Sequence, residues 1–201
     1  MASLTRKSPE RNLPRSFFAR DAVTVARELI GVLLLVDDVG GIIVEAEAYD
    51  RTDPASHSYG GRQTPRNASM FGPVGHAYVY RSYGVHWCLN FVCGTEPMGG
   101  AALIRALEPV AGIAAMENRR GLTERRQLCA GPGRLTEALA ITGALDGRSL
   151  YAPPFSLKAR TAPVEIAVGP RIGLTRAVET PWRFGLAGSR FISRRFGREL
   201  V

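Results

Sequence analysis

The sequence predicts a single domain of the α+β class, with flanking helices on a mainly antiparallel sheet. Short runs of alternating apolar and polar residues are separated by turn residues, which is typical of β-hairpins. The helical segments are few and short, and cap and stop residues bound them. No internal repeat, low-complexity stretch or linker divides the 201 residues, a length at which one domain buries well over half of its unfolded surface.

The elements can be placed in chain order. Residues 1–15 are polar and basic and lack the apolar core of a signal peptide, so we expect a flexible tail ahead of a domain at 16–201. Asp21 suits an N-cap and predicts a helix over 22–30 that Gly31 ends. The elements expected next are strands at 32–36 and 42–49 around a turn at 37–41, strands at 76–80 and 85–92 around a turn at 81–84, a strand at 101–107, a helix from Pro109 through Asn118 closed by 119–121, a helix at 134–141 ended by Gly143, a loop at 150–162, and short strands at 164–168 and 191–192.

The strand at 42–49 carries two carboxylates on one face. Alternation places Glu45 and Glu47 beside Ile43 and Tyr49, while the opposite face is apolar and suits the core. A carboxylate among apolar neighbours loses hydration unless something compensates it. An ordinary solvent-facing strand is the alternative interpretation, and the segment that follows favours a site.

That segment combines a polar loop with a hairpin. The loop at 50–71 is rich in turn formers and carries a histidine, glycines and arginines. In the hairpin, Tyr78 and Tyr80 share a face of the first strand, and Asn90 lies on the polar face of the second. Tyr83 is then left at the tip, where no core can bury it.

The motifs to compare with known families are Val44-Glu45-Ala46-Glu47-Ala48-Tyr49, His57-Ser58, Gly60-Gly61-Arg62-Gln63-Thr64-Pro65-Arg66-Asn67, Met70-Phe71, Tyr78-Val79-Tyr80, Tyr83-Gly84, Cys88-Leu89-Asn90, Leu103-Ile104-Arg105-Ala106-Leu107-Glu108-Pro109, Cys129-Ala130-Gly131-Pro132 and Arg171-Ile172-Gly173. From about Arg20 to Ser193, the chain resembles the alkyladenine (3-methyladenine) DNA glycosylase family. The resemblance implies a compact domain with a curved sheet and a protruding hairpin that inserts into DNA. It also implies a DNA glycosylase of base excision repair. Such a hydrolase flips out alkylated purines of the 3-methyladenine and 7-methylguanine type, cuts the N-glycosidic bond and leaves an abasic site.

By this resemblance Glu47 is the catalytic base. Cleavage passes through an oxocarbenium-like sugar cation, which a carboxylate stabilises while it takes a proton from the attacking water. An alkylated purine is already cationic and can leave without an acid to protonate it. The resemblance places Arg105 beside Glu47 and the water, whereas a purely structural Arg105 would pair with Glu108 or Asp146. Glu45 is expected to be structural, with an arginine as its partner.

The resemblance also assigns the residues that bind the base. Tyr49 and Tyr80 sandwich the flipped base, because aromatic rings stack on bases and attract a cationic one. His57 lines the edge of the base or reaches the adjacent phosphate, and Asn90 clashes with the exocyclic amino group of normal guanine. Tyr83 is the wedge that fills the gap left in the base stack.

Contacts to the DNA backbone are expected from the loop. Arg62 and Thr64 suit phosphates, and Arg66 either does the same or braces the loop. The segment 131–133 is interpreted as an ordinary helix start, because no GK[ST] follows its glycines. The C-terminal arginines either extend the DNA contact or belong to a solvated tail; they are Arg190, Arg194, Arg195 and Arg198.

Composition narrows the possible partners. The formal net charge of +8 implies an anionic partner, and the family resemblance implies that this partner is double-stranded DNA with damaged bases. Of the 26 basic residues only Lys7 and Lys158 are lysines; arginine suits phosphate, although genome composition can give the same bias. Cysteine and histidine spacings predict no disulfide framework, metal or cofactor, and favour a reducing cytoplasm, with association with the nucleoid in a bacterium. We expect a monomer that does not bind membranes, since no apolar run reaches the ~18–20 residues of a span.

The scarcity of lysine bears on mechanism. A glycosylase that also nicks the strand needs an amine for a Schiff base, and neither lysine is expected near the site. We therefore expect a monofunctional enzyme that leaves the strand intact at the abasic site. Two alternatives remain open: a damaged-DNA sensor without turnover, and a hydrolase of free nucleosides. Glu47 disfavours the first, and the wedge Tyr83 together with the arginine excess disfavours the second.

Overall fold

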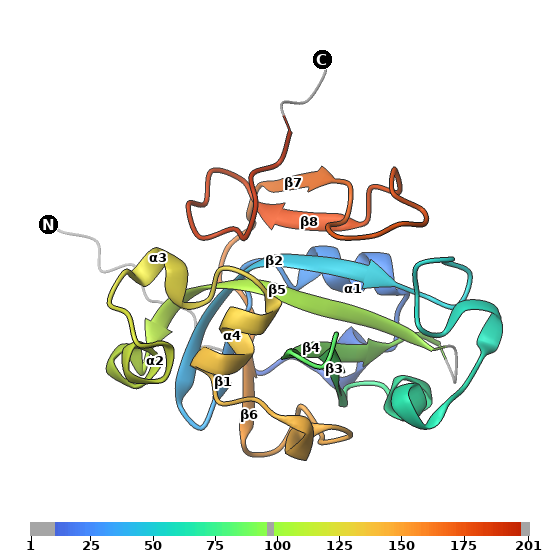
Figure 1. Cartoon of the computed structure of the whole chain (residues 1–201), viewed down its shortest axis with the longest axis horizontal. Helices are drawn as coiled ribbons and strands as arrows, with labels where there is room; N and C mark the ends of the chain where they lie inside the picture. Colours follow the sequence, from blue (N-terminus) through green and yellow to red (C-terminus); the bar gives the residue numbers. More distant parts are fainter. Residues whose placement is uncertain (1–10, 96–98, 198–201) are drawn as a thin grey trace, which may run out of the picture.

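An eight-stranded, curled antiparallel sheet forms the centre of the molecule (Figure 1), which confirms the predicted α+β class. The computed structural model describes residues 11–95 and 99–197. Its strands are β1 (Leu33–Val36), β2 (Val39–Tyr49), β3 (Ala77–Ser82), β4 (His86–Cys93), β5 (Gly100–Ala111), β6 (Phe155–Lys158), β7 (Ile166–Gly169) and β8 (Arg183–Leu186). Its α-helices are α1 (Ala22–Glu28), α2 (Ile113–Arg120), α3 (Arg125–Leu128) and α4 (Pro132–Ala138), and short 3-10 turns lie at Arg15–Phe17, Tyr59–Gly61, Pro65–Phe71 and Gly143–Leu145.

Strand β2 organises the sheet, whose main order is β3-β4-β5-β2-β1-β6. The first part of β2 pairs with β1, its last part pairs with β8, and β5 runs along nearly all of it. Register shifts on both sides of Glu45 mark β-bulges, which bend a strand. Glu45 and Glu47 therefore lie in the segment of β2 that pairs with both β5 and β8.

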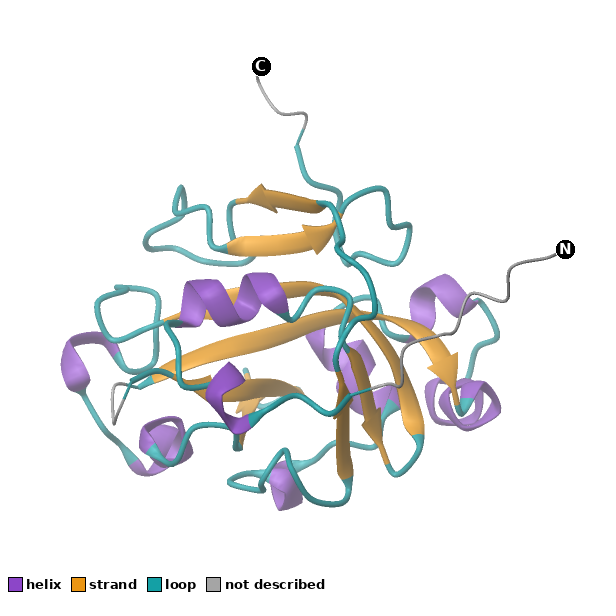
Figure 2. Ribbon diagram, turned by 180° about the vertical axis from the view of Figure 1, so that it is seen from behind, coloured by secondary structure: helices purple, strands orange, loops and turns teal. Residues whose placement is uncertain are grey.

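Helices cover both sides of the sheet. Figure 1 shows α4 in front of the strands, and Figure 2, from behind, shows α1 on the other side. Helix α1 buries Val25 and Ala26 against β2 and β5, and α4 buries Leu135 and Ala138 next to β4 and β5. Asp21 caps α1 as expected, because its side chain accepts a hydrogen bond from the backbone N–H of Thr24 at 2.8 Å.

One turn and one helix start differ from the expected positions. The first hairpin turns over Asp37 and Asp38 alone, both with positive φ, so the expected turn at 37–41 was too long. Gly40 and Gly41 instead belong to β2, where a Cβ would lie 2.0 Å from a backbone oxygen of the neighbouring strand. Pro109 continues β5 and does not open a helix; it pairs at a register shift, where its missing N–H interrupts no regular ladder.

The C-terminal third departs most from expectation. Strand β6 lies inside the expected loop at 150–162, and β8 was not predicted at all. The expected strand at 191–192 is absent from the described structure, and the one expected at 164–168 is β7. Helix α4 begins and ends earlier than the expected 134–141. Strands of four residues carry little periodicity, and long-range pairing with β1 and β2 decides whether they form.

Residues 1–10 of the expected tail, Lys7 among them, lie outside the described structure. Residues 11–15 pack on the domain: Leu13 is buried, and Asn12 forms a β-bridge to Lys158. Among the residues described, no helix has the length and apolar character needed to cross a membrane.

Candidate active site

Glu47 lies near the end of β2, with its side chain fully buried. Its Oε2 accepts hydrogen bonds from the Tyr49 hydroxyl at 2.8 Å and from Arg105 Nη1 at 3.2 Å. Its Oε1 accepts one from the backbone N–H of Ile172 at 2.8 Å. A carboxylate offers about four acceptor positions, so three donors leave room for one more.

The three donors to Glu47 also line a cavity of about 640 Å³, whereas Glu47 itself does not. The carboxylate therefore lies directly behind the cavity wall that Tyr49, Arg105 and Ile172 form. Burial and then the negative charge of Glu47 raise the pKa of Tyr49 well above its ordinary value. Tyr49 thus stays protonated and acts as the donor in its bond to Glu47.

Arg105 projects from β5 and joins the two carboxylates of β2. Its Nη1 donates to Glu47, and its Nε donates to Glu45 at 3.1 Å. The alternative structural partner Asp146 is engaged elsewhere, accepting from the backbone N–H of Val79 and from Ser69. Arg105 therefore takes the position beside Glu47 that the family resemblance implies.

Glu45 is fully buried and pairs with arginine, as expected. Its Oε1 accepts from Arg105, from Arg183 Nε at 2.7 Å and from the Ser193 hydroxyl at 2.8 Å. Its Oε2 accepts from the backbone N–H of Ser193. Arg183, itself buried, also donates to the backbone oxygen of Arg194. Glu45 thereby ties the strand that carries Glu47 to the C-terminal segment.

Aromatic side chains form another part of the cavity lining. The ring of His57 meets the ring of Tyr80 edge-on, with centroids 4.6 Å apart. The Tyr78 hydroxyl lies 2.9 Å from His57 Nδ1, and Tyr78 is almost fully buried. Partial burial, and then the positive charge of Arg66, lower the pKa of His57. A neutral imidazole at this wall does not repel a cationic base.

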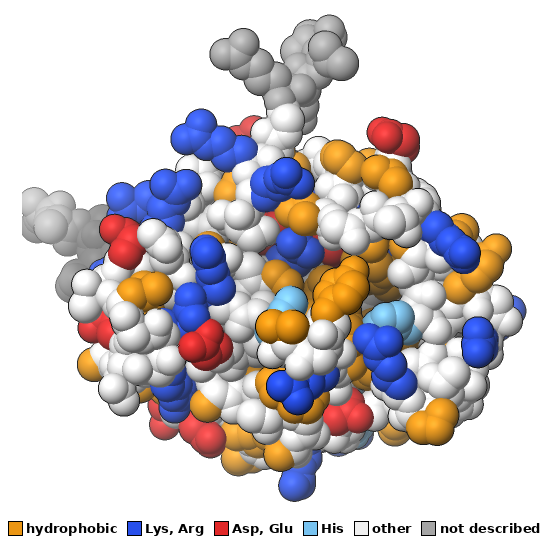
Figure 3. All heavy atoms as spheres, in the orientation of Figure 1, with side chains coloured by type: hydrophobic (Ala, Val, Ile, Leu, Met, Phe, Trp, Pro, Cys, Tyr) orange, Lys and Arg blue, Asp and Glu red, His pale blue; other side chains and the backbone are white. Residues whose placement is uncertain are grey.

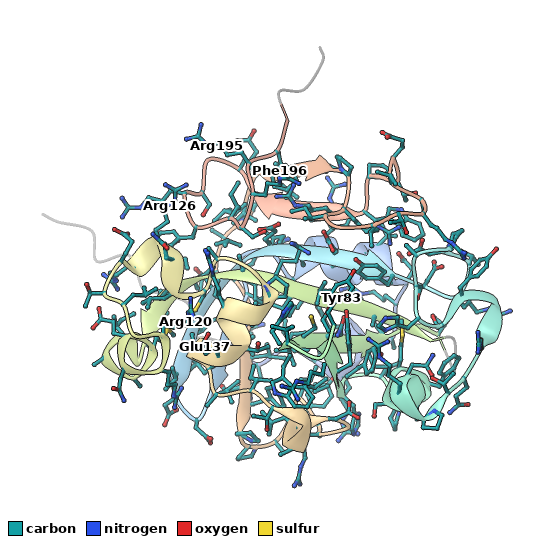
Figure 4. All side chains as sticks on the ribbon, in the orientation of Figure 1. Tyr83, Arg120, Arg126, Glu137, Arg195 and Phe196 are labelled. Carbon is teal, nitrogen blue, oxygen red and sulfur yellow. The ribbon has the colours of Figure 1, made fainter. Side chains whose placement is uncertain are left out.

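The hairpin of β3 and β4 supplies two more predicted residues. Asn90 is buried at the cavity wall and donates to the backbone oxygen of Tyr78 at 3.0 Å. Tyr83 lies at the tip, 88% exposed, with a left-handed φ of 50°. Figure 4 shows Tyr83 near the middle of its face, and Figure 3 shows that this face is hollowed near its middle.

The loop residues divide into two groups. Arg66 lines the cavity, and its guanidinium lies 5.4 Å from the Tyr80 ring centroid. Arg62 is exposed outside the cavity lining, and the Thr64 hydroxyl bonds to Asn67. Buried Asn67, which carried no expected role, also donates to the backbone oxygens of His57 and Arg62, and so shapes the loop.

Several residues of the site lie in the C-terminal third and had no role in the sequence analysis. Arg171 forms a buried ion pair with Asp53 and lies 4.7 Å from the centroid of the Tyr49 ring. Ile172 bonds to Glu47, and residues 172–176 line the cavity. The motif Arg171-Ile172-Gly173 was the only sequence signal for this segment. Arg183 and Ser193 had none.

No group of three potential metal ligands occurs within residues 11–95 and 99–197. An enclosed acid behind a cavity with aromatic walls can serve a reaction at the sugar of a flat base, and the exposed Tyr83 beside it can enter a base stack. This arrangement fits the class of DNA glycosylases.

Comparison with known proteins identifies the family. Residues 16–190 match the methylpurine-DNA glycosylase (MPG) family. A Bradyrhizobium diazoefficiens protein named "Putative 3-methyladenine DNA glycosylase" is 57% identical over 199 residues, covering 98% of this chain and 99% of the relative. Proteins of the same name from Rhodopseudomonas palustris (strain ATCC BAA-98 / CGA009) and Granulibacter bethesdensis are 61% and 60% identical, covering 92% and 90% of this chain and 90% and 87% of their own lengths. The chain belongs to the methylpurine-DNA glycosylase family.

Proposed function

We propose that this protein is a monofunctional glycosylase that releases alkylated purines of the 3-methyladenine and 7-methylguanine type from double-stranded DNA. The observation that carries the proposal is the position of Glu47, held by Tyr49, Arg105 and Ile172 directly behind the wall of a cavity. The family membership supports the reaction class. The geometry supports the assignment of roles within it.

In the proposed reaction, Glu47 activates one water molecule. The remaining acceptor position of its carboxylate holds the water, and Arg105 keeps the carboxylate in place. The water oxygen bonds to C1′ of the sugar as the N-glycosidic bond breaks, and Glu47 takes the proton. The electron pair of the broken bond neutralises the positive charge of the alkylated base. The negative carboxylate stabilises the oxocarbenium-like sugar in between.

The aromatic side chains of the cavity bind the flipped base in this proposal. Flipping a base out of a duplex costs a few kcal/mol, and stacking on aromatic side chains recovers ~1–3 kcal/mol per base. Tyr49 and Tyr80 line the cavity and offer those faces, while His57 lines the edge and Asn90 excludes the amino group of guanine. Tyr83 fills the gap in the duplex, at a hairpin tip that has no core of its own to fill.

Residues around the cavity determine the contacts to the DNA backbone and the product of the reaction. Arg62, Thr64 and Arg66 contact phosphates near the flipped base. The described lysine, Lys158, belongs to β6 and is absent from the cavity lining, so the proposed product is an intact strand with an abasic site. Because DNA is its substrate, the proposed activity belongs in the cytoplasm, and at the nucleoid if the cell is bacterial.

The test is Glu47→Gln, assayed on duplexes that carry 7-methylguanine or 3-methyladenine. Removing a general base typically costs about 10²–10⁴-fold in rate, so base release should fall at least a hundredfold while lesion-duplex binding is kept. The matched control is Glu28→Gln on α1, on the other side of the sheet, which should release bases at the wild-type rate.

The same assay distinguishes the proposed enzyme from a damaged-DNA sensor and from a nucleoside hydrolase. Full base release by Glu47→Gln would overturn the assigned role of Glu47. Wild-type protein that binds lesions without releasing them would be a sensor, and equal release from free nucleosides would indicate a nucleoside hydrolase. Strand cleavage before heat or alkali treatment would contradict the monofunctional mechanism.

A further inference from the structure

A group of exposed arginines lies on two segments that the tertiary structure brings together. Helix α3 contributes Arg125 and Arg126, and the C-terminal segment contributes Arg190, Arg194 and Arg195. Arg126 Nε donates to the backbone oxygen of Arg190 at 2.8 Å, which joins the two segments. We call these five residues the α3–C-terminal arginine surface.

The C-terminal half of this surface is anchored, which distinguishes it from a solvated tail. Ser193 is bound to Glu45 through both its backbone N–H and its hydroxyl. Buried Arg183 donates to the backbone oxygen of Arg194 and lies 3.9 Å from the Phe196 ring centroid. The backbone that carries the exposed arginines is therefore fixed to the strand that bears Glu47.

The charges of the surface are available to a ligand. Within the described part of the chain, none of the five arginines takes part in an ion pair. The nearest acid in the sequence, Glu124, accepts a hydrogen bond from the backbone N–H of Arg126 and offsets one of the five charges. A net positive surface of this kind attracts polyanions, and guanidinium groups suit phosphate oxygens.

The surface shares a face with the proposed wedge. Figure 4 shows Arg126 and Arg195 on the same side of the molecule as Tyr83, and Figure 3 shows blue side chains, which are arginines here, over α3 and the C-terminal segment. Arg66 lies at the cavity and marks a second positive position on this face. A duplex held over Tyr83 passes beyond the cavity and presents further phosphates to the face.

We propose that the α3–C-terminal arginine surface binds phosphates of the DNA backbone beyond the cavity, on the side of Tyr83 where α3 lies. The inference rests on the proposed function, because it takes the duplex to lie over Tyr83. The contacts hold and orient the DNA without reading sequence and without taking part in base release. The surface therefore sets affinity and its salt dependence, while Glu47 sets the rate.

The experiment compares the double variant Arg194→Gln/Arg195→Gln with the control double variant Arg11→Gln/Arg27→Gln. The control removes the same charge from exposed positions elsewhere, and Arg27 lies on α1 behind the sheet. Affinity for a duplex with one abasic site is measured from 0.05 to 0.5 M salt. Each lost phosphate contact reduces the slope of log K against log salt by about 0.9, so the first variant should lose about 1.8. At 0.1 M salt this corresponds to roughly 60-fold weaker binding if the proteins bind equally at 1 M.

Base release under single-turnover conditions, with enzyme in saturating excess at low salt, should stay within about twofold of wild type. An unchanged slope, or a loss equal to that of the control pair, would overturn the proposal. A slower saturated rate with an unchanged slope would also overturn it. The affinity measurement does not require base release. A wild-type protein that releases no base would therefore contradict the proposed function, while the comparison of salt slopes would still test the arginine surface.

Discussion

Glu45 and Glu47 differ by two positions in the sequence and have separate roles in the structure. Glu47 accepts from Tyr49, which lines the cavity, whereas Glu45 accepts from Arg183 and Ser193, which do not; Arg105 donates to both carboxylates. The pairing with arginine was expected for Glu45. Its second arginine and Ser193 come from a part of the chain about 140 residues away, which no local pattern could indicate.

This division predicts that Glu45→Gln acts on stability. The change leaves buried Arg183 without its carboxylate, and breaking a buried ion pair costs about 3–5 kcal/mol. Urea unfolding should show a loss of this size. Glu28→Gln breaks the exposed pair with Arg20 and should cost at most about 1 kcal/mol. Equal losses in the two variants would contradict a structural role for the Glu45 network.

His57 predicts a pH dependence of lesion recognition. Burial and the charge of Arg66 lower its pKa, so the ring stays neutral near pH 7 and gains a proton only below its ordinary value of about 6.5. A protonated His57 repels a cationic base. The preference for 7-methylguanine duplex over undamaged duplex should therefore fall as the pH drops from 7 to 5.

The measurement uses Glu47→Gln protein, so that the base is not released during binding. In Glu47→Gln/His57→Gln the preference should vary less over the same pH range, because Gln carries no proton-dependent charge. A fall of equal size in both proteins would assign the pH dependence to another group.

At the scale of elements, β2 depends on glycine for its close pairing. A Cβ on Gly41 would lie 2.0 Å from the backbone oxygen of Glu108, so Gly41→Ala must displace β5 from β2. Overpacking typically costs about 1–3 kcal/mol, and a clash with backbone falls at the upper end. Thermal unfolding should show this loss, and Gly197→Ala, with no atom within 4 Å of its Cβ, should leave the melting temperature unchanged. A stable Gly41→Ala protein would contradict the register at this bulge.

The elements predicted correctly from the sequence are those with local signals. The cap at Asp21 and the alternation along 85–92 indicated α1 and β4, and the second pattern correctly placed Tyr83 at an exposed tip. Pro109 was misassigned because a proline at a bulge and a proline at a helix start look alike in sequence. Only pairing with Gly41 distinguishes them.

At the scale of the whole molecule, we predict a monomer in the absence of DNA. The large hydrophobic side chains exposed in the described structure are scattered singly or lie at the hairpin tip, and a stable dimer needs a contiguous apolar patch. The net charge of +8 adds repulsion between copies. Sedimentation equilibrium should give the chain mass of 21.8 kDa across the micromolar range. A mass that rises toward twice this value with concentration would contradict the prediction.

The sequence by itself determined the fold class, the positions of the chemically active residues on strand, loop and hairpin tip, and the resemblance that implied their roles. These properties depend on periodicity, turn residues and local motifs, which act over a few neighbouring residues. The tertiary structure alone decided that Glu47 lies behind the cavity wall, that Ile172 donates to its carboxylate, and that Glu45 fixes the C-terminal segment to β2. Those contacts join residues more than a hundred positions apart, and only the pairing and packing of the whole sheet bring them together.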